Sequence, residues 1–306
     1  MTAVIVLVGS TATGKSALAV DLALSLTGAG QLAEIVNTDS MLVYRGMDIG
    51  TAKPTTEECR GVPHHLIDIM DLHQTASVAV FQGLARQAIA DCHRRQVVPI
   101  LVGGSALYLH AIIDHFDFPP TNEELRAQLN TELGQVGAQV LHDRLRDLDP
   151  ASAAKIGPAD SRRIVRALEA IELNGQFAPA LPQWSYALNG VTQIGLDIDR
   201  EQMDRRIQTR VDQMWQRGFV DEVRTLLNSG LRESPTASRA IGYRQIMAFL
   251  DHDITEAEAR DLTVVRTRQF SRKQLSWWRR DPRIRWVPAG TPADQVLRMI
   301  GSKGVV

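Results

Sequence analysis

Short runs of apolar residues alternate along the chain with longer amphipathic stretches. Several runs are rich in valine and isoleucine and end at glycine or polar residues, which is typical of strands buried on both faces of a parallel sheet. These runs are residues 3–8, 33–38, 97–102 and 191–198. Apolar Leu66, Ile67 and Ile69 predict a further strand over residues 63–71. Pro99 fits its strand only if its missing backbone donor faces an edge or a bulge.

Most of these runs are followed by apolar residues at helical spacing. In residues 15–26, Leu18, Ala19, Leu22 and Leu26 lie on one face of the expected helix. Further helices are expected at residues 78–95, 105–113, 200–227 with an interruption at Gly218, and 256–278. Alternating strands and helices predict an α/β fold, a P-loop-type parallel sheet flanked by helices.

The pattern changes between residues 117 and 190. Helix follows helix there without a strand pattern, and a stretch that contains prolines leads back to the next strand. The expected helices are residues 122–133, 138–148 and 160–173. We therefore expect a small all-helical insertion domain at residues 117–190, within an α/β core formed by residues 1–116 and 191–306.

Composition and charge exclude several classes of protein. The 306 residues carry a net charge of -1, and 44% are hydrophobic, as in an ordinary soluble enzyme. Cys59 and Cys92 form no Cys-x-x-Cys pair, so neither a disulfide scaffold nor a zinc ribbon is expected, and a reducing compartment fits. No signal-peptide pattern and no apolar run of membrane-spanning length occurs, so we predict a cytoplasmic protein without a membrane partner.

Residues 9–16 have the most specific chemistry. They fit the phosphate-binding pattern G-x-x-x-x-G-K-[ST] in full, between a predicted strand and a predicted helix. Loop amides and the helix N-terminus bind an oxyanion, Lys15 adds a positive charge, and Ser16 offers a hydroxyl to Mg²⁺. The pattern specifies a di- or triphosphate but not ATP, and the alternative is a chance glycine-rich turn. The predicted phosphate-binding residues are Gly9, Ser10, Thr11, Ala12, Thr13, Gly14, Lys15 and Ser16.

Two other predicted strand ends carry polar groups. Asp39 follows the second strand, where it can act as a general base, hold a metal-bound water or cap a following helix. Gly103, Gly104 and Ser105 follow residues 97–102, where nucleotide hydrolases and many kinases place an aspartate for Mg²⁺. Paired glycines indicate close approach of the backbone to a ligand, and Ser105 is expected in the same crevice as Asp39.

Basic and aromatic residues are concentrated in residues 262–287. Eight basic residues stand there against one acid, Asp281, with Phe270 and three tryptophans among them. Such a segment is typical of nucleic-acid binding, because cations bind phosphates and rings stack on unpaired bases. The alternative is core aromatics beside a solvated face. The basic residues are Arg266, Arg268, Arg272, Lys273, Arg279, Arg280, Arg283 and Arg285.

Other polar groups give weaker signals. Four arginines of the insertion form either an RNA-binding surface or a solvated helix face. They are Arg126, Arg162, Arg163 and Arg166. His64 and His65 are adjacent, with no cysteine or third histidine at ligand spacing, so structural or surface roles are predicted. Lys53 is either a polar contact in the loop of residues 41–54 or a solvated lysine.

Together these features resemble the tRNA dimethylallyltransferases of the bacterial type, the tRNA isopentenyltransferase or IPP transferase family. The resemblance runs nearly from end to end, and the D-S and G-T-A-K-P segments together are far more specific than the phosphate loop alone. The matching stretches are GSTATGKS at 9–16, NTDSMLVYRGMDIGTAKP at 37–54, LVGGSALY at 101–108, DSRRIVRALE at 160–169, MWQRGFVDEV at 214–223, GYRQ at 242–245 and RQFSRKQLSWWRRDPRIRWV at 268–287.

The resemblance implies a reaction. The family transfers the dimethylallyl group of dimethylallyl diphosphate to the exocyclic N6 amine of the adenosine on the 3′ side of the anticodon in tRNA, assisted by Mg²⁺. Asp39 matches the aspartate that takes the amine proton, and Ser105 matches a threonine at the reacting groups. Lys15 and the phosphate loop stabilise the leaving diphosphate, and Arg210 and Arg244 are candidates for further contacts to it.

The resemblance also implies contacts to the anticodon stem-loop of tRNA. The target base has to leave its stack to reach Asp39, and a single-stranded loop lowers that cost. We expect a monomer whose insertion closes over the RNA. The implied tRNA-binding residues are Asp39, Ser40, Met41, Leu42, Ser105, Arg126, Arg162, Arg163, Ile164, Val165, Arg166, Arg239, Ala240, Ile241, Gly242, Tyr243 and Arg244.

Two other functions explain part of the pattern. A P-loop nucleotide or small-molecule kinase explains the phosphate loop, but neither residues 103–105 nor the basic segment. A P-loop RNA-binding switch without catalysis explains the basic surface, but it assigns no role to Asp39. Ser10, Ser16 and Ser105 stand where the family usually has proline, threonine and threonine, and they keep the required geometry or hydroxyl.

Overall fold

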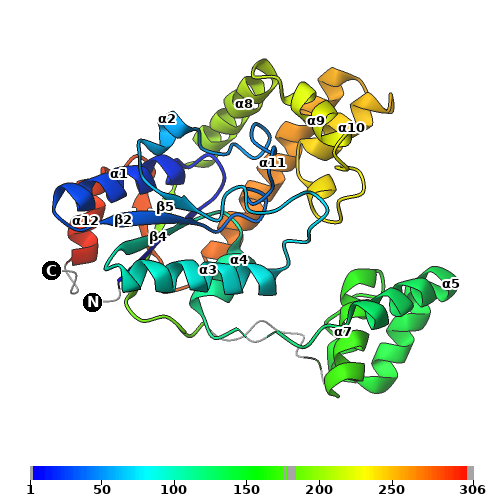
Figure 1. Cartoon of the computed structure of the whole chain (residues 1–306). Coiled ribbons are helices and arrows are strands. Elements are labelled where there is room, and N and C mark those ends of the chain that lie inside the picture. The colour runs from blue at the N-terminus through cyan, green and yellow to red at the C-terminus, as the bar shows by residue number, and fades with distance from the viewer. Residues whose placement is uncertain (1–2, 117, 176, 178–183, 302–306) are drawn as a thin grey trace. The chain divides into compact units, whose positions relative to one another are not determined.

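A parallel sheet forms the centre of the larger part of the molecule (Figure 1). The computed structural model describes residues 3–116, 118–175, 177 and 184–301. The sheet has six strands in the order β3-β2-β4-β1-β5-β6, all paired in parallel. Its strands are β1 Val4–Gly9, β2 Ala33–Asn37, β3 His64–His65, β4 Val98–Val102, β5 Val191–Asp197 and β6 Arg285–Pro288. The fold class predicted from the sequence is confirmed.

The chain divides into two compact units. The insertion is His115–Ser185, and the residues on either side of it, which include the whole sheet, form the core unit. The predicted insertion limits were residues 117 and 190. The helices of the core unit are α1 Lys15–Gly28, α2 Thr56–Cys59, α3 Val78–Arg94, α4 Ala106–Ile113, α8 Arg200–Gln216, α9 Phe219–Leu227, α10 Tyr243–Leu250, α11 Glu256–Trp278 and α12 Ala293–Gly301, with a short 3₁₀ helix, η1, at Ala237–Arg239.

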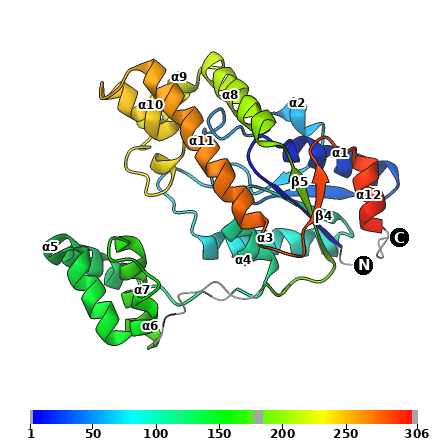
Figure 2. The same cartoon turned by 180° about the vertical axis from the view of Figure 1, so that it is seen from behind.

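Side chains of β1 alternate between two hydrophobic layers. Ile5 and Leu7 pack in the layer that includes α1 and α12. Val4, Val6 and Val8 pack in the layer that includes α3, α4 and α11. Because both faces are covered, the strand reads as a continuous apolar run rather than an alternating one. Helices α8 and α10 lie beside α11, and α9 contacts α8 and α10 (Figure 2).

Two strand predictions need correction. The strand expected at residues 63–71 is limited to the two residues of β3, because Leu66 and Asp68 have positive φ angles of 64° and 54° that end the extended backbone. The strand that contains Pro99 is central, not an edge. Its pairing with β1 begins one residue later, at Ile100 opposite Ile5, so the missing donor falls where that ladder has not yet begun.

The insertion is helical, as predicted. Its helices are α5 Glu123–Leu148, α6 Pro150–Ala153 and α7 Ser161–Asn174. Gly137, with φ 83°, kinks α5 between the two helices expected there. Leu129, Leu141, Ile164 and Leu168 are buried in a hydrophobic cluster of the insertion, which therefore has a small core of its own.

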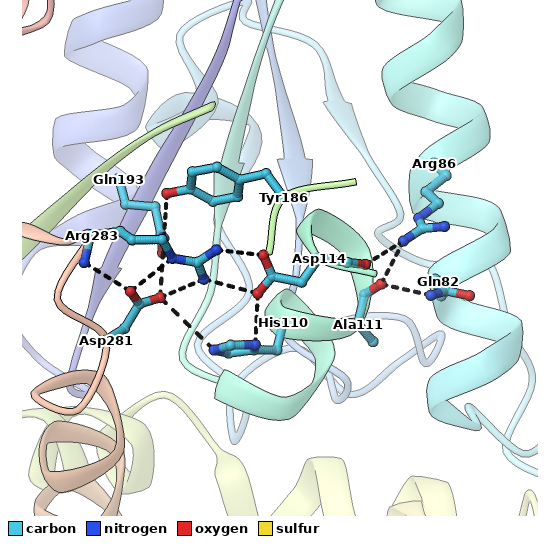
Figure 3. A network of polar contacts seen from close by, with 9 residues as sticks. All are labelled: Gln82, Arg86, His110, Ala111, Asp114, Tyr186, Gln193, Asp281 and Arg283. Carbon is cyan, nitrogen blue, oxygen red and sulfur yellow. Dashed lines mark hydrogen bonds and ion pairs between the residues drawn. The ribbon is translucent and has the colours of Figure 1, made fainter. Parts of the chain in front are cut away.

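A buried ionic network within the core unit includes Asp114 and Tyr186, the two residues that flank the insertion in the sequence (Figure 3). Asp114, at the end of α4, forms an isolated bridge with Tyr186. The Arg283 guanidinium donates to both carboxylate oxygens of Asp114 at 2.6 and 2.9 Å and to Asp281 at 2.7 and 2.9 Å. It also lies 4.1 Å from the centroid of the Tyr186 ring. Arg283, expected at the RNA-binding surface, is thus a structural group instead.

Candidate active site

The phosphate loop joins β1 to α1. Gly14 precedes α1 with a left-handed φ of 93°, and Ala12 has φ 67°. Residues with a side chain rarely adopt this left-handed backbone conformation, so a glycine at position 14 suits the turn. The first-turn amides of α1 have no acceptors within the helix, so they are donors for an anion held in the loop.

Lys15 provides a positive charge inside this loop. Its Nζ donates to the Ser10 carbonyl at 2.6 Å, and the Thr13 hydroxyl donates to the same oxygen at 2.9 Å. Burial, followed by the charge of Arg210, lowers the pKa of Lys15 to about 7, although Asp39 opposes this change. A bound diphosphate would offset both causes, because an adjacent anion favours the ammonium form.

Asp39 lies in a rigid turn after β2. Its amide donates to Asn37 Oδ1 at 2.8 Å, and Asn37 Nδ2 returns a bond to the Asp39 carbonyl at 2.9 Å. Asp39 Oδ1 accepts from the Met41 amide at 2.9 Å, so the carboxylate caps a turn and not the helix considered from the sequence. Burial raises the pKa of Asp39, and the Met41 bond and the charges of Lys15 and Arg210 only partly oppose this.

The two glycines after β4 allow protein groups, rather than a ligand, to approach the backbone. A Cβ on Gly103 would lie 2.6 Å from the Thr38 carbonyl carbon and 2.9 Å from the Asp39 nitrogen. A Cβ on Gly104 would lie 2.3 Å from Gln274 Nε2. This corrects the interpretation from the sequence. Ser105 follows as the half-buried N-cap residue of α4.

The structure separates the two arginine candidates for diphosphate contacts. Arg210, on α8, is half-buried and close enough to Lys15 and Asp39 to act on the pKa of each. Arg244 is exposed in the first turn of α10 and is not among the charges that act on those two groups in the described part of the chain. Next to Asp39, Ser40 is buried, and Met41 and Leu42 are half-buried.

The predicted tRNA-binding residues of the insertion differ in exposure. Arg162 and Arg163 are exposed on α7. Ile164 and Val165, on the same helix, are buried in the hydrophobic core of the insertion. Two further arginines form ion pairs with one buried glutamate. Arg126 Nη2 lies 3.0 Å, and Arg166 Nη1 2.8 Å, from Glu169 Oε2, whose side chain is fully buried. The bond from Arg126 holds α5 against α7, whereas Arg166 and Glu169 both belong to α7. Less of the charge of either arginine is therefore available to RNA.

Residues 239–244 are likewise divided. Arg239 and Arg244 are exposed and Ile241 is half-buried, whereas Ala240, Gly242 and Tyr243 are buried. The Tyr243 hydroxyl donates to Glu222 Oε1 at 2.6 Å, and burial, with the Glu222 charge, raises the pKa of Tyr243. Its side chain has no surface left for RNA.

Glu222, which the sequence interpretation did not single out, organises the G-T-A-K-P loop. Its carboxylate accepts from the amides of Asp48, Ile49 and Gly50 at 3.1, 2.6 and 3.2 Å. Lys53, in the same loop, is 8% exposed and lies 2.6 Å from Asp48 Oδ1 and 2.9 Å from the Tyr44 carbonyl. The solvated alternative for Lys53 is therefore wrong.

The basic segment is partly neutralised by acids from elsewhere in the chain. Arg268 and Arg272 pair with Asp204 of α8, and Arg279 pairs with Asp197 of β5. Arg285 donates to the Met299 carbonyl at 2.8 Å, and Trp278 is buried. Arg266, Lys273 and Arg280 remain as exposed cations on or next to α11.

One group of side chains in the described residues lies close enough to hold a metal ion: Glu34, His65 and Cys92. Arg95 already occupies it, because its guanidinium donates twice to Glu34 at 2.6 Å. The group is therefore a structural ion pair, which agrees with the structural role predicted for His65. None of the helices among the described residues is long and apolar enough to span a membrane.

Comparison with known proteins adds independent information. Relatives that carry the name tRNA dimethylallyltransferase include two proteins that are 53% identical to this chain. The protein from Cutibacterium acnes (strain DSM 16379 / KPA171202) is 53% identical over 289 residues, which cover 94% of this chain and 91% of that protein. The protein from Thermobifida fusca (strain YX) is 53% identical over 293 residues, which cover 95% and 92%.

Solved structures are similar over the same extent. The full-length tRNA isopentenylpyrophosphate transferase from Bacillus halodurans has a TM-score of 0.73 and 38% identity, covering 99% of this chain and 97% of its own. A eukaryotic dimethylallyltransferase acting on tRNA has a TM-score of 0.79 and 26% identity, covering 96% and 77%.

A sequence profile of the IPP transferase family matches residues 42–281. Together with the relatives at 53% identity over nearly the whole length, this match shows that the chain belongs to the IPP transferase family.

Proposed function

We propose that this chain transfers the dimethylallyl group of dimethylallyl diphosphate to the N6 amine of the adenosine on the 3′ side of the anticodon in tRNA. The products are N6-dimethylallyladenosine and diphosphate. The relatives are named tRNA dimethylallyltransferase. In this chain, the observation that carries the proposal is one carboxylate, Asp39, close enough to Lys15 of a phosphate loop for each charge to act on the other's pKa.

The adenine amine is a weak nucleophile because its lone pair is delocalised into the ring. As N6 bonds to C1 of the dimethylallyl group, the C1–O bond breaks, and its electron pair leaves with the diphosphate. N6 then has to lose a proton. A carboxylate with a raised pKa is a suitable acceptor, and Asp39 is held in one orientation by the Asn37 turn.

Charge on the leaving diphosphate is stabilised by the phosphate loop. Lys15, Arg210 and the N-terminus of α1 provide positive charge around that position. Mg²⁺ fits the donors present there, since Ser16 is exposed in the first turn of α1 and offers a hard hydroxyl oxygen beside those of the diphosphate. When bound, the ion would supply further positive charge to the leaving group.

The exposed arginines are the contacts that we propose for the anticodon stem-loop. They are Arg162, Arg163, Arg239 and Arg244, with the exposed cations of α11. We further propose that the insertion is the domain that contacts tRNA and that the enzyme acts in the cytoplasm as a monomer. A substrate with a phosphate backbone is expected to bind more weakly as salt rises.

The test is a mass spectrum of unmodified anticodon stem-loop RNA after incubation with the protein, Mg²⁺ and dimethylallyl diphosphate, without ATP. One added dimethylallyl group on the adenosine 3′ of the anticodon would establish donor, acceptor and independence from ATP. No gain, with phosphoryl transfer or hydrolysis once ATP is supplied, would favour the kinase instead. Asp39→Asn, with the same RNA affinity and no product, is the matched control.

A further inference from the structure

Beyond the residues discussed above, we propose that Gln274 is a positioning residue that sets the distance between the diphosphate-binding and the acceptor-binding halves of the active site. The inference rests on the proposed prenyl transfer, and it names a group whose carboxamide bonds to protein groups at both ends. Gln274 lies in α11, near the C-terminal end of that helix.

The Gln274 carboxamide is buried, with 5% of the residue exposed, and both of its polar atoms are used. Its Oε1 accepts from the Thr11 amide at 2.9 Å and from the Thr11 hydroxyl at 3.3 Å. Its Nε2 donates to the Gly104 carbonyl at 2.9 Å. One side chain therefore connects the phosphate loop with the loop after β4.

Each end of this connection leads directly to a reacting group. On the donor side, Thr11 belongs to the loop that holds the diphosphate. On the acceptor side, Gly104 precedes Ser105 and follows Gly103, whose α-carbon lies so close to Thr38 and Asp39 that a Cβ would collide with their backbone. The position of Asp39 relative to the phosphate loop thus depends on a chain of contacts that passes through Gln274.

Another contact secures the same helix to the phosphate loop. Ser271, one turn earlier in α11, is buried, and its hydroxyl donates to the Met203 sulfur at 3.1 Å and to the Thr11 carbonyl at 3.5 Å. The Ser10 hydroxyl donates to that sulfur at 3.3 Å. Ser271 therefore holds the helix to the phosphate loop, whereas Gln274 extends the link to Gly104.

The chemistry makes this spacing important. N6, C1 and the leaving oxygen have to be aligned within a few tenths of an ångström, and a misplacement of about 1 Å can cost about 100-fold in rate. Thr11 offers hydrogen-bond donors and Gly104 offers an acceptor. A carboxamide accepts at one end and donates at the other without carrying a charge, so glutamine matches both partners.

Gln274→Met tests this role, because methionine has a similar volume and cannot make either bond. We expect kcat for prenyl transfer to fall by about 100-fold, while the affinity for inorganic pyrophosphate, measured by calorimetry, stays within about threefold. An unchanged kcat would overturn the proposal. So would an equal loss of pyrophosphate affinity, which would mean that Gln274 only stabilises the phosphate loop.

A second variant gives a sharper test. Gly104→Ala places a Cβ 2.3 Å from Gln274 Nε2, so it should displace the carboxamide and lower kcat as Gln274→Met does. In a Gln274→Ala background the collision disappears, and Gly104→Ala should cost little more. Gly103→Ala is the matched control, because its Cβ meets the Thr38 hydroxyl and the backbone of Thr38 and Asp39 but not Gln274, and should cost the same in both backgrounds. Equal costs of Gly104→Ala in both backgrounds would contradict the link.

An activity-independent measurement separates this proposal from the proposed function. The Thr11 amide should exchange with deuterium faster in Gln274→Met than in the wild-type protein, because the variant lacks the Gln274 oxygen that accepts its hydrogen bond. If the wild type transfers no prenyl group, the proposed function fails, and the exchange measurement still decides whether the link exists. Equal exchange rates would overturn the link even in an active enzyme.

Discussion

Replacing Arg283 by methionine removes the cation between two buried carboxylates. The side chains of Asp114 and Asp281 are each 2% exposed, and that of Arg283 is 17% exposed. The variant loses the bonds from the guanidinium to both acids, while Asp114 keeps the His110 ring at 2.8 Å and Asp281 keeps Gln193 Nε2 at 3.2 Å. The carboxylates then remain buried without their counter-ion.

The expected cost follows from that imbalance. Removing one partner of a buried ion pair costs about 3–5 kcal/mol, because the remaining charge is left uncompensated. For a unit of this size, about 2 °C of melting midpoint corresponds to 1 kcal/mol. We therefore expect the midpoint of Arg283→Met to fall by about 6–10 °C at pH 8.

The cost should depend on pH. In the wild type, burial alone would raise the pKa of Asp114 and of Asp281. The bonds from Arg283, with smaller contributions from His110 to Asp114 and from Gln193 to Asp281, outweigh burial and hold both below their usual range. That stability is present above the unfolded pKa and is lost as pH falls through the folded one. In the variant, burial remains and both folded pKa values rise, so its deficit should shrink from pH 8 to pH 5.

Thermal unfolding followed by circular dichroism at both pH values measures these effects. Arg298→Met is the matched control, because Arg298 and its partner Asp294 are 71% and 64% exposed. Exposed pairs of this kind contribute little to stability, so its midpoint should change by about 1 °C or less. A midpoint for Arg283→Met close to that of the control, or a deficit that grows as pH falls, would refute the reasoning.

Three further predictions concern the site and its support. Asp39→Asn should lower single-turnover prenyl transfer by about 100-fold or more while RNA affinity in a filter-binding assay stays within about threefold, and weakened RNA binding would contradict the assignment as base. Because the ammonium of Lys15 has a pKa of about 7 before the anion binds, pyrophosphate affinity, corrected for protonation of the anion itself, should decline as pH rises above 7, whereas a corrected calorimetric profile that is flat to pH 9 would exclude this role. Glu222→Gln should destabilise the core unit by about 2 kcal/mol, since a charged acceptor of three amides is lost, and an unchanged urea midpoint would show that the loop is held elsewhere.

Local sequence patterns were sufficient for most of the fold. Strands such as β1 are apolar on both faces, and α11 begins at Glu256 and ends at Trp278, within the range expected from its periodicity. The misplaced strand at residues 63–71 ends because two residues adopt positive φ, which apolar alternation does not reveal. The sequence analysis did not predict β6 either, since its four residues, Arg285–Pro288, lie in a segment dominated by arginines.

The same limit applies to the site. The phosphate loop is contiguous, so its residues were identified together, and Asp39 stands at a strand end. Gln274, in contrast, bonds to residues 263 and 170 positions away in the chain. The basic segment was overestimated for the same reason, because its acidic partners Asp204 and Asp197 belong to other elements. Contacts between residues that are far apart in the chain cannot be predicted from the local patterns of a single sequence.

The position of β1 in the sheet has a consequence for synthesis on the ribosome. Strand β1 is synthesised before both of its partners in the sheet, which are β4, where Ile5 pairs with Ile100, and β5, where Val4 pairs with Val191. At bacterial and eukaryotic translation rates, β5 follows roughly 10–40 s later. For that time, a strand destined for complete burial has unpaired edges, which other chains can pair with. The nascent chain therefore needs protection of β1 from such pairing until β5 has been synthesised.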